Sequence, residues 1–184
     1  GSLTVNGSGG TTTLNANITQ AFISITDSIF VNGNRTLTAT DSGGLALNGA
    51  ISGKTGADNL TLAASDAVGP VSVVGTFGNG GGFFLNNVTL GSIADVVFNA
   101  KGQINGALQI TSGTDLNEEI SLATNGGTMT ANSINFAAGS PVFLTGTTQL
   151  TTGLAAGNNI SFSGTLDGTQ TLGLTAGLGD IIFS

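Results

Sequence analysis

The stretch that decides the fold is "LGLTAGLGDIIFS", residues 172–184, at the end of the chain. Leu172 and Leu174 alternate with smaller residues, and Ile181 and Phe183 alternate in the same way after a Gly-rich segment. Alternation with a period of two places each apolar pair on one face of a β-strand, and Gly is a turn residue. The stretch therefore predicts two short strands, joined by a turn, whose apolar pairs face a common interior.

The second half of this stretch has copies elsewhere in the chain. Its pattern is an Asp or Asn, a β-branched residue, any residue and then Phe, as in Asp180–Phe183. The pattern returns in Asp95–Phe98 and Asn159–Phe162, and more loosely in Ser133–Phe136. Such recurrence is expected when each module must pack against similar modules, because one short pair of strands cannot bury its inner face alone.

Segments of alternating apolar residues recur along the chain at intervals of about two dozen residues. The intervals are 23 from Leu37 to Leu60 and from Leu60 to Phe83, 25 from Phe83 to Leu108, 24 from Val96 to Ile120, and 26 from Leu108 to Ile134. The two prolines, Pro70 and Pro141, each precede such a segment and lie 71 residues apart, close to three intervals. A period in the range of about 20–50 residues, with short strands in each module, is typical of a solenoid.

We therefore predict an all-β fold in which residues 1–184 form a single β-solenoid, a parallel β-helix of about eight coils of roughly 23–25 residues. No window shows apolar residues at the i, i+3, i+4 spacing of a helix. The alternative is a β-sandwich, which also has short strands separated by turns. A sandwich does not, however, require similar modules at a long and nearly constant period.

The composition excludes several classes of protein. Only 7% of the residues are charged, against about a quarter in an average domain. The net charge is −7, and Arg35, Lys54 and Lys101 are the only basic side chains, too few to neutralise a nucleic-acid backbone. No apolar run approaches the roughly 18 residues of a membrane-spanning helix. We therefore expect neither nucleic-acid binding nor a membrane span.

The acidic residues give no pattern that indicates catalysis. They are Asp27, Asp41, Asp58, Asp66, Asp95, Asp115, Glu118, Glu119, Asp167 and Asp180, nearly all isolated beside Gly or Asn. A polysaccharide-active enzyme on this fold would need several carboxylates clustered with Arg, Lys or His. We predict turn positions for these acids, no enzyme, no catalytic residues and no cofactor.

One acidic cluster remains, in "SGTDLNEEIS" around Asp115, Glu118 and Glu119. Three carboxylates with backbone carbonyls could hold Ca²⁺, which takes six to eight oxygen ligands. The other interpretation is a solvated loop before the strand at Ile120–Leu122. We predict the loop and assign no metal site.

Pairs of threonines suggest ice binding as an alternative function, because ice-binding solenoids present a flat face of regularly spaced outward Thr side chains. The pairs are Thr36/Thr38, Thr128/Thr130, Thr145/Thr147 and Thr169/Thr171. They do not fall at a constant period, and Thr is also a common outward residue of strands. One regular Thr face would be required for this function.

Two further features concern the surface. Asn-x-Ser/Thr sequons occur at Asn6, Asn17, Asn34, Asn59, Asn87 and Asn159, a number that we attribute to chance in a chain rich in Asn and Thr.

Phe83 and Phe84 are neighbours after a Gly- and Asn-rich tract. Because neighbouring strand residues face opposite ways, one of these rings should point outward and is a candidate contact with another chain.

The modules resemble the β-strand repeats of large secreted surface proteins of bacteria. The resemblance lies in the Leu-x-Leu-x-Ala-Gly-x-Gly-Asp-Ile-x-Phe form of residues 172–183 and in the opening "SLTVNGSGGTTTLNANI", residues 2–18. Both are similar to repeats of filamentous-haemagglutinin-like exoproteins and of autotransporter passenger regions. The resemblance implies a right-handed parallel β-helix, export to the cell surface, and a role as an adhesin shaft or matrix fibre.

From these features we expect an extracellular structural protein that forms a cell-surface fibre, a matrix filament or an adhesin shaft. A carbohydrate- or surface-binding adhesin is the alternative, and the absence of Trp and Tyr favours the fibre. An uncapped solenoid exposes unpaired strands at its ends. We therefore expect end-to-end self-association or continuation of the same solenoid, with cell-surface or matrix polysaccharide as a further partner.

Overall fold

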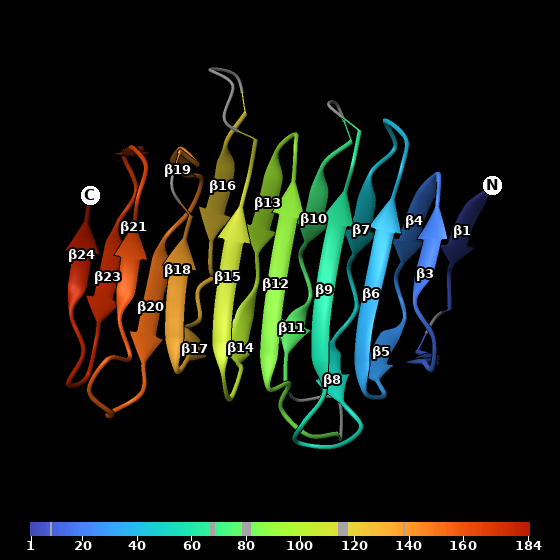
Figure 1. The fold of residues 1–184 in the computed structure, drawn as a ribbon, viewed down its shortest axis with the longest axis horizontal. Coiled ribbons are helices and arrows are strands. Elements are labelled where there is room, and N and C mark those ends of the chain that lie inside the picture. Colours follow the sequence, from blue (N-terminus) through green and yellow to red (C-terminus); the bar gives the residue numbers. More distant parts are fainter. Residues whose placement is uncertain (8, 67–68, 79–81, 114–117, 138) are drawn as a thin grey trace.

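A computed structural model describes residues 1–7, 9–66, 69–78, 82–113, 118–137 and 139–184. Within these ranges the chain forms 24 β-strands and no helix, so none that could cross a membrane. In Figure 1 the strands lie across the long axis of the molecule and are stacked side by side along it, and the chain advances from one end to the other. The all-β prediction is confirmed.

The strands form three sheets of eight strands each. Sheet A contains β1 (Ser2–Val5), β4 (Phe22–Ile25), β7 (Leu45–Leu47), β10 (Val71–Val73), β13 (Val96–Asn99), β16 (Ile120–Ala123), β19 (Val142–Leu144) and β22 (Leu166–Asp167). Sheet B contains β2 (Thr11–Leu14), β5 (Ser28–Val31), β8 (Ile51–Gly53), β11 (Thr76–Phe77), β14 (Lys101–Gln103), β17 (Met129–Ala131), β20 (Thr148–Thr152) and β23 (Leu172–Thr175). Sheet C contains β3 (Ile18–Gln20), β6 (Asn34–Ala39), β9 (Asn59–Ala64), β12 (Asn87–Ser92), β15 (Ala107–Thr111), β18 (Ser133–Phe136), β21 (Ile160–Phe162) and β24 (Ile181–Phe183).

Successive strands along the chain belong to sheets A, B and C in turn, and strands of the same sheet pair in parallel. Each set of three strands is one rung of a solenoid, from rung 1 (β1–β3) to rung 8 (β22–β24), so seven full turns separate the first rung from the last. The predicted parallel β-helix is confirmed. The β-sandwich alternative is wrong, because the sheets are parallel and wind around one axis.

The length of a turn varies more than the predicted 23–25 residues. Paired residues are separated by as few as 17 positions, from Thr11 to Ser28, and by as many as 28, from Leu62 to Leu90. The variation lies in the corners, because the inward positions of neighbouring strands stay in register. The predicted stacking of Val96 on Ile120 and of Leu108 on Ile134 is confirmed.

Three predicted stacking pairs are wrong. Leu37 pairs with Leu62 rather than Leu60, Leu60 pairs with Val88 rather than Phe83, and Phe83 lies outside the strands of sheet C, so it does not pair with Leu108. A shift of two residues keeps the same side chains inward, so spacing alone does not distinguish the two registers. The apolar segment at Phe83 belongs to the loop that precedes β12, and its resemblance to a strand misled the prediction.

The interior is a stack of apolar columns. On sheet C, Val88, Leu108, Ile134 and Ile160 stack in one column, and Leu90, Ile110, Phe136 and Phe162 in the next, all of them buried. The ring centroids of Phe136 and Phe162 are 4.6 Å apart, and those of Phe162 and Phe183 are 5.4 Å apart. The three copies of the four-residue pattern that end in these phenylalanines therefore lie in consecutive rungs of one sheet.

The fourth copy, Asp95–Phe98, lies in sheet A instead. Its phenylalanine, Phe98, faces the same interior and stacks against Phe77 of sheet B at a centroid distance of 6.1 Å. The same four-residue pattern thus occurs in two different sheets of the solenoid. The pattern specifies a corner residue followed by a strand whose first and third residues point inward, and it does not specify which sheet the strand joins.

Asparagines form a ladder where the strands of sheet C begin. Asn59 Nδ2 donates to Asn34 Oδ1 at 2.6 Å, and Asn87 Nδ2 donates to Asn59 Oδ1 at 2.8 Å. Asn87 Oδ1 then accepts the backbone N–H of Ala107 at 2.8 Å. Each asparagine side-chain oxygen accepts a hydrogen bond from the following rung. The ladder therefore joins rungs 2 to 5 and holds them in register.

We predict that Phe162→Ala lowers the free energy of unfolding by about 3–5 kcal/mol, because it removes a buried ring that packs on Phe136 and Phe183. Denaturant unfolding followed by circular dichroism measures the change. Phe143→Ala is the matched control, since Phe143 faces outward on sheet A and its loss should cost less than about 1 kcal/mol. Equal costs for the two variants would contradict the assigned interior.

A second prediction concerns the ladder. Asn59→Ala should cost about 1–2 kcal/mol, because it removes the donor to Asn34 and the acceptor of Asn87. The exposed Gln109, two rungs further along sheet C, gives the control Gln109→Ala, expected within about 0.5 kcal/mol of the wild type. Hydrogen exchange should show faster opening at β6, β9 and β12 in Asn59→Ala alone, and uniform exchange in both variants would count against the ladder.

Candidate functional site

The described acidic residues lie at corners, as predicted for turn positions, except Asp167 at the end of β22, and several of them accept backbone N–H groups. Asp41 Oδ1 accepts from Ser42, Asp167 Oδ1 from Gly168, and Asp95 Oδ1 from Glu119 of the following rung. Asp58 is buried, and its two oxygens accept the backbone N–H groups of Gly33 and Thr55. These carboxylates therefore stabilise corners.

The three cations are spread over different rungs. Arg35 lies in β6, Lys54 directly follows β8, and Lys101 lies in β14. Arg35 Nη1 donates to the backbone carbonyl of Asn34, and Lys101 Nζ donates to that of Asn125 at 3.2 Å. Lys54 lines a cleft on the outer face of sheet B.

The acidic cluster near Ile120 is only partly covered by the structure, since Asp115 lies outside the described residues. Glu119 donates its backbone N–H to Asp95, and its Oε1 accepts from Ser121 Oγ at 3.3 Å. The described residues contain no group of three or more acids, His or Cys placed to hold a metal ion. The Ca²⁺ interpretation therefore gains no support from Glu118 and Glu119.

The predicted threonine pairs lie on different parts of the molecule. Thr36 and Thr38 are in β6 of sheet C and Thr130 is in β17 of sheet B, whereas the pairs Thr145/Thr147 and Thr169/Thr171 lie in corners. Thr36, Thr61 and Thr89 do stack on successive rungs, but Gln109 follows them in the same column. The four pairs thus form no single face.

The sequons have a structural cause, which corrects their attribution to chance. All but that of Asn6 lie where a strand of sheet C begins, at Asn17, Asn34, Asn59, Asn87 and Asn159. The asparagine oxygen accepts a hydrogen bond from the following rung in each. The second residue then points inward, and the Thr or Ser points outward. The requirements of the corner, the interior and the outer face together reproduce the sequon pattern.

The loop before β12 is the clearest departure from the repeat. Phe83 forms an antiparallel bridge with Gly53 of β8, with N–H···O distances of 2.7 and 2.9 Å. The described residues Gly82 and Phe83 of this loop thus lie against sheet B of the preceding rungs. Phe83 is 60% exposed and Phe84 is half-buried, which confirms that one of the two neighbouring rings points outward.

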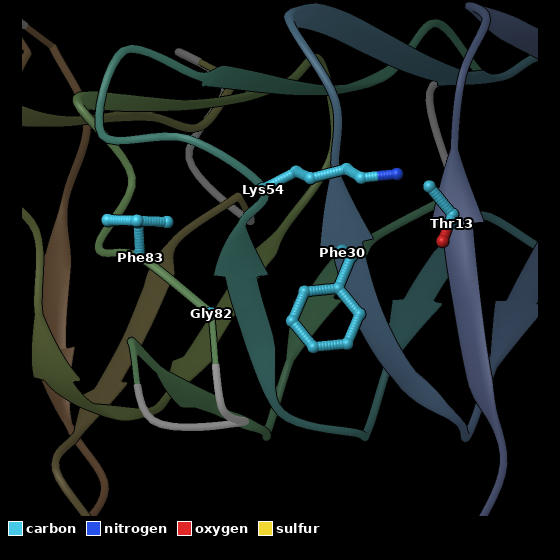
Figure 2. Close-up of a pocket in the computed structure, with 5 residues that line it drawn as sticks. All are labelled: Thr13, Phe30, Lys54, Gly82 and Phe83. Carbon is cyan, nitrogen blue, oxygen red and sulfur yellow. The ribbon is translucent and has the colours of Figure 1, made fainter.

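This loop closes one side of a cleft on the outer face of sheet B. The cleft has a volume of about 300 Å³ and is lined by Thr13, Phe30, Lys54, Gly82 and Phe83. Figure 2 shows the Phe30 ring between Gly82 and Thr13, with the Lys54 side chain extended toward Thr13. The described chain thus brings together an aromatic ring, a cation and a hydroxyl from three rungs, beside a loop from a fourth.

The backbone fixes the positions of these groups. Lys54 donates its N–H to Val31 O at 2.8 Å, and Asp58 holds the turn that follows by accepting from Thr55. Gly82 lies so close to Phe30 that a Cβ there would approach the ring to 2.6 Å and Gly53 O to 2.5 Å. Only glycine lets the loop lie against the ring.

Sequence reasoning missed Phe30 and the cleft, although it singled out Phe83. A signal for Phe30 was present in "SIFV", since Ile29 and Val31 are inward and the ring between them must face outward. The fold-back of the loop had no such signal, because it depends on one contact between residues 30 positions apart in the sequence.

Comparison with known proteins found no matching family model, no similar curated protein and no similar solved structure.

We predict that Gly82→Ala displaces the loop, because its Cβ has no room between Phe30 and Gly53. Hydrogen exchange should then show loss of protection at the amides of Gly53 and Phe83, with protection elsewhere retained. Gly91→Ala is the matched control, since a Cβ at Gly91 in β12 meets nothing within 4 Å. Retained protection at Gly53 in Gly82→Ala would show that the contact is looser than described.

Proposed function

We propose that this chain is a non-enzymatic structural shaft, a stretch of secreted β-solenoid that forms or extends a fibre on a cell surface. The fold supports this role mechanically. Each rung adds parallel-strand hydrogen bonds and one layer of apolar stacking, so the stability of the rod is a sum over neighbouring rungs. The eight rungs span roughly 34 Å at about 4.8 Å per step, and further rungs would lengthen the rod without altering its cross-section.

The observation that carries the proposal is the open apolar edge at rung 8. Ile160 and Phe162 of β21 are fully buried, whereas Ile181 and Phe183, which stack on them in β24, are 42% and 60% exposed. β22 and β23 are likewise the last strands of their sheets. A single further rung would bury this layer and pair its open backbone groups.

The opposite edge is suited to the same kind of contact. Leu3 and Val5 of β1 and Ile18 of β3 are only partly buried, although they belong to the apolar interior. Parallel pairing is directional, so the outer side of rung 1 and the outer side of rung 8 are complementary in strand direction. We infer that the two edges can pair with each other, so that copies of the chain stack end to end.

Export and a place on the cell surface are parts of this proposal that rest on the residues alone. The resemblance to filamentous-haemagglutinin-like exoproteins and autotransporter passenger regions supports them. The low charge content agrees with this placement, since the polar residues of the chain are mostly Thr, Ser and Asn rather than charged side chains.

We predict that the chain associates end to end as its concentration rises, and that Phe183→Lys abolishes this association by placing a charge in the open edge. Sedimentation velocity measures the size, and electron microscopy shows whether the product is a rod of constant width. Phe143→Lys, on the outer face of sheet A, is the control and should associate like the wild type. A wild type that stays monomeric throughout, or one that Phe143→Lys disrupts equally, would refute the stacking of copies.

A further inference from the structure

The cleft beside Phe30 has the features of a small ligand site, and its chemistry is independent of the shaft role. Small-molecule sites combine an apolar surface with a few fixed polar groups, and this cleft, at about 300 Å³, lies at the lower end of their size range. The apolar surface is the Phe30 ring, which points outward from β5 and is half-buried. The fixed polar groups are the Lys54 ammonium and the Thr13 hydroxyl.

The charge of the cleft is opposite to that of the protein. Lys54 is the single charged residue among the five described residues that line it, whereas the whole chain carries a net charge of −7. An ammonium group donates up to three hydrogen bonds and forms its strongest ones with an anionic oxygen. The cleft therefore favours a ligand that places an anionic oxygen beside Lys54.

The aromatic ring selects the rest of the ligand. The face of a phenylalanine ring carries partial negative charge and attracts the partially positive hydrogens of C–H groups. One face of a pyranose ring presents such C–H groups, and its hydroxyls can bond to Thr13. A sulfate or phosphate ion would use Lys54 and leave the Phe30 ring uncovered, and a neutral sugar would use the ring and leave Lys54 without an anionic partner.

We propose that this cleft binds an acidic sugar residue, a uronic acid of a surface or matrix polysaccharide, with its ring over Phe30 and its carboxylate on Lys54. Thr13 hydrogen-bonds a ring hydroxyl, and Gly82 and Phe83 close one side. One cleft of this size gives weak affinity, so strong attachment requires many clefts along an assembled fibre.

The test is a titration of the full chain with a trisaccharide of β-1,4-linked glucuronic acid, followed by NMR or calorimetry. Cellotriose is the matched neutral sugar, since it differs mainly in lacking the carboxylates. We expect the acidic trisaccharide to bind at least about tenfold more tightly than cellotriose. Benzoate and acetate separate this site from a general one for small anions, and both should bind more weakly than the trisaccharide.

Two pairs of variants locate the site. Lys54→Gln should weaken binding of the acidic trisaccharide about tenfold, and Lys101→Gln, a cation on the outer face of the same sheet, should leave it unchanged. Phe30→Ser should also weaken binding, whereas Phe143→Ser, an outward ring on sheet A, should not. All four positions face outward, and unchanged thermal unfolding confirms that a variant remains folded.

The proposal is overturned if the acidic trisaccharide binds no better than cellotriose, if acetate or benzoate binds as tightly, or if Lys101→Gln weakens binding as much as Lys54→Gln. These results leave the shaft role untouched, because binding is measured on one chain and association on many. Conversely, a chain that never associates end to end can still bind the trisaccharide.

Discussion

The structure depends on one constraint, which is that no rung can bury its own inner face. Ile160 and Phe162 are fully buried because Ile134 and Phe136 lie on one side of them and Ile181 and Phe183 on the other. Ile181 and Phe183, which are described with a neighbouring rung on one side, are exposed. Apolar burial is therefore a property of neighbouring rungs, and it forces every rung to repeat the inward pattern of the last. The resulting parallel pairing makes the molecule a rod that can be extended and leaves its corners free to vary in length.

This constraint also explains how much could be predicted from the sequence. The inward pattern must repeat, so the solenoid and the stacking of Val96 on Ile120 could be predicted from spacing. Corners need not repeat, so spacing failed where a corner was long, and the segment at Phe83 was taken for a strand of the repeat although it lies in a loop. Alternation indicates which residues face outward, as at Phe30, but it does not indicate which loop covers them. The solenoid was therefore predictable, whereas the cleft, which depends on the fold-back of Gly82 and Phe83, was not.

A second consequence concerns polar groups, since a chain with so few charges needs another means of fixing its register. Apolar columns allow a shift of two residues, because the same side chains stay inward. The amides of Asn34, Asn59 and Asn87 remove this freedom, since each must meet its partner on the next rung. Asp58 and Asp95 act similarly by accepting backbone N–H groups of a neighbouring rung. Hydrogen bonds at the corners thus specify the register that the interior leaves open.

Function in such a rod is expected where the repeat is broken, because uniform faces present the same groups at every step. The outer columns of sheet C carry mainly Thr, Asn, Ser, Gln and small residues. The break at Gly82 is different, because the loop runs against the direction of the rungs and places its backbone beside an outward aromatic ring and a lysine. A loop in a corner costs the interior nothing, since the inward residues of β11 and β12 remain buried on either side of it. A corner of the solenoid can therefore carry a cleft, which we propose to be a binding site, while the stacking of the rungs is kept.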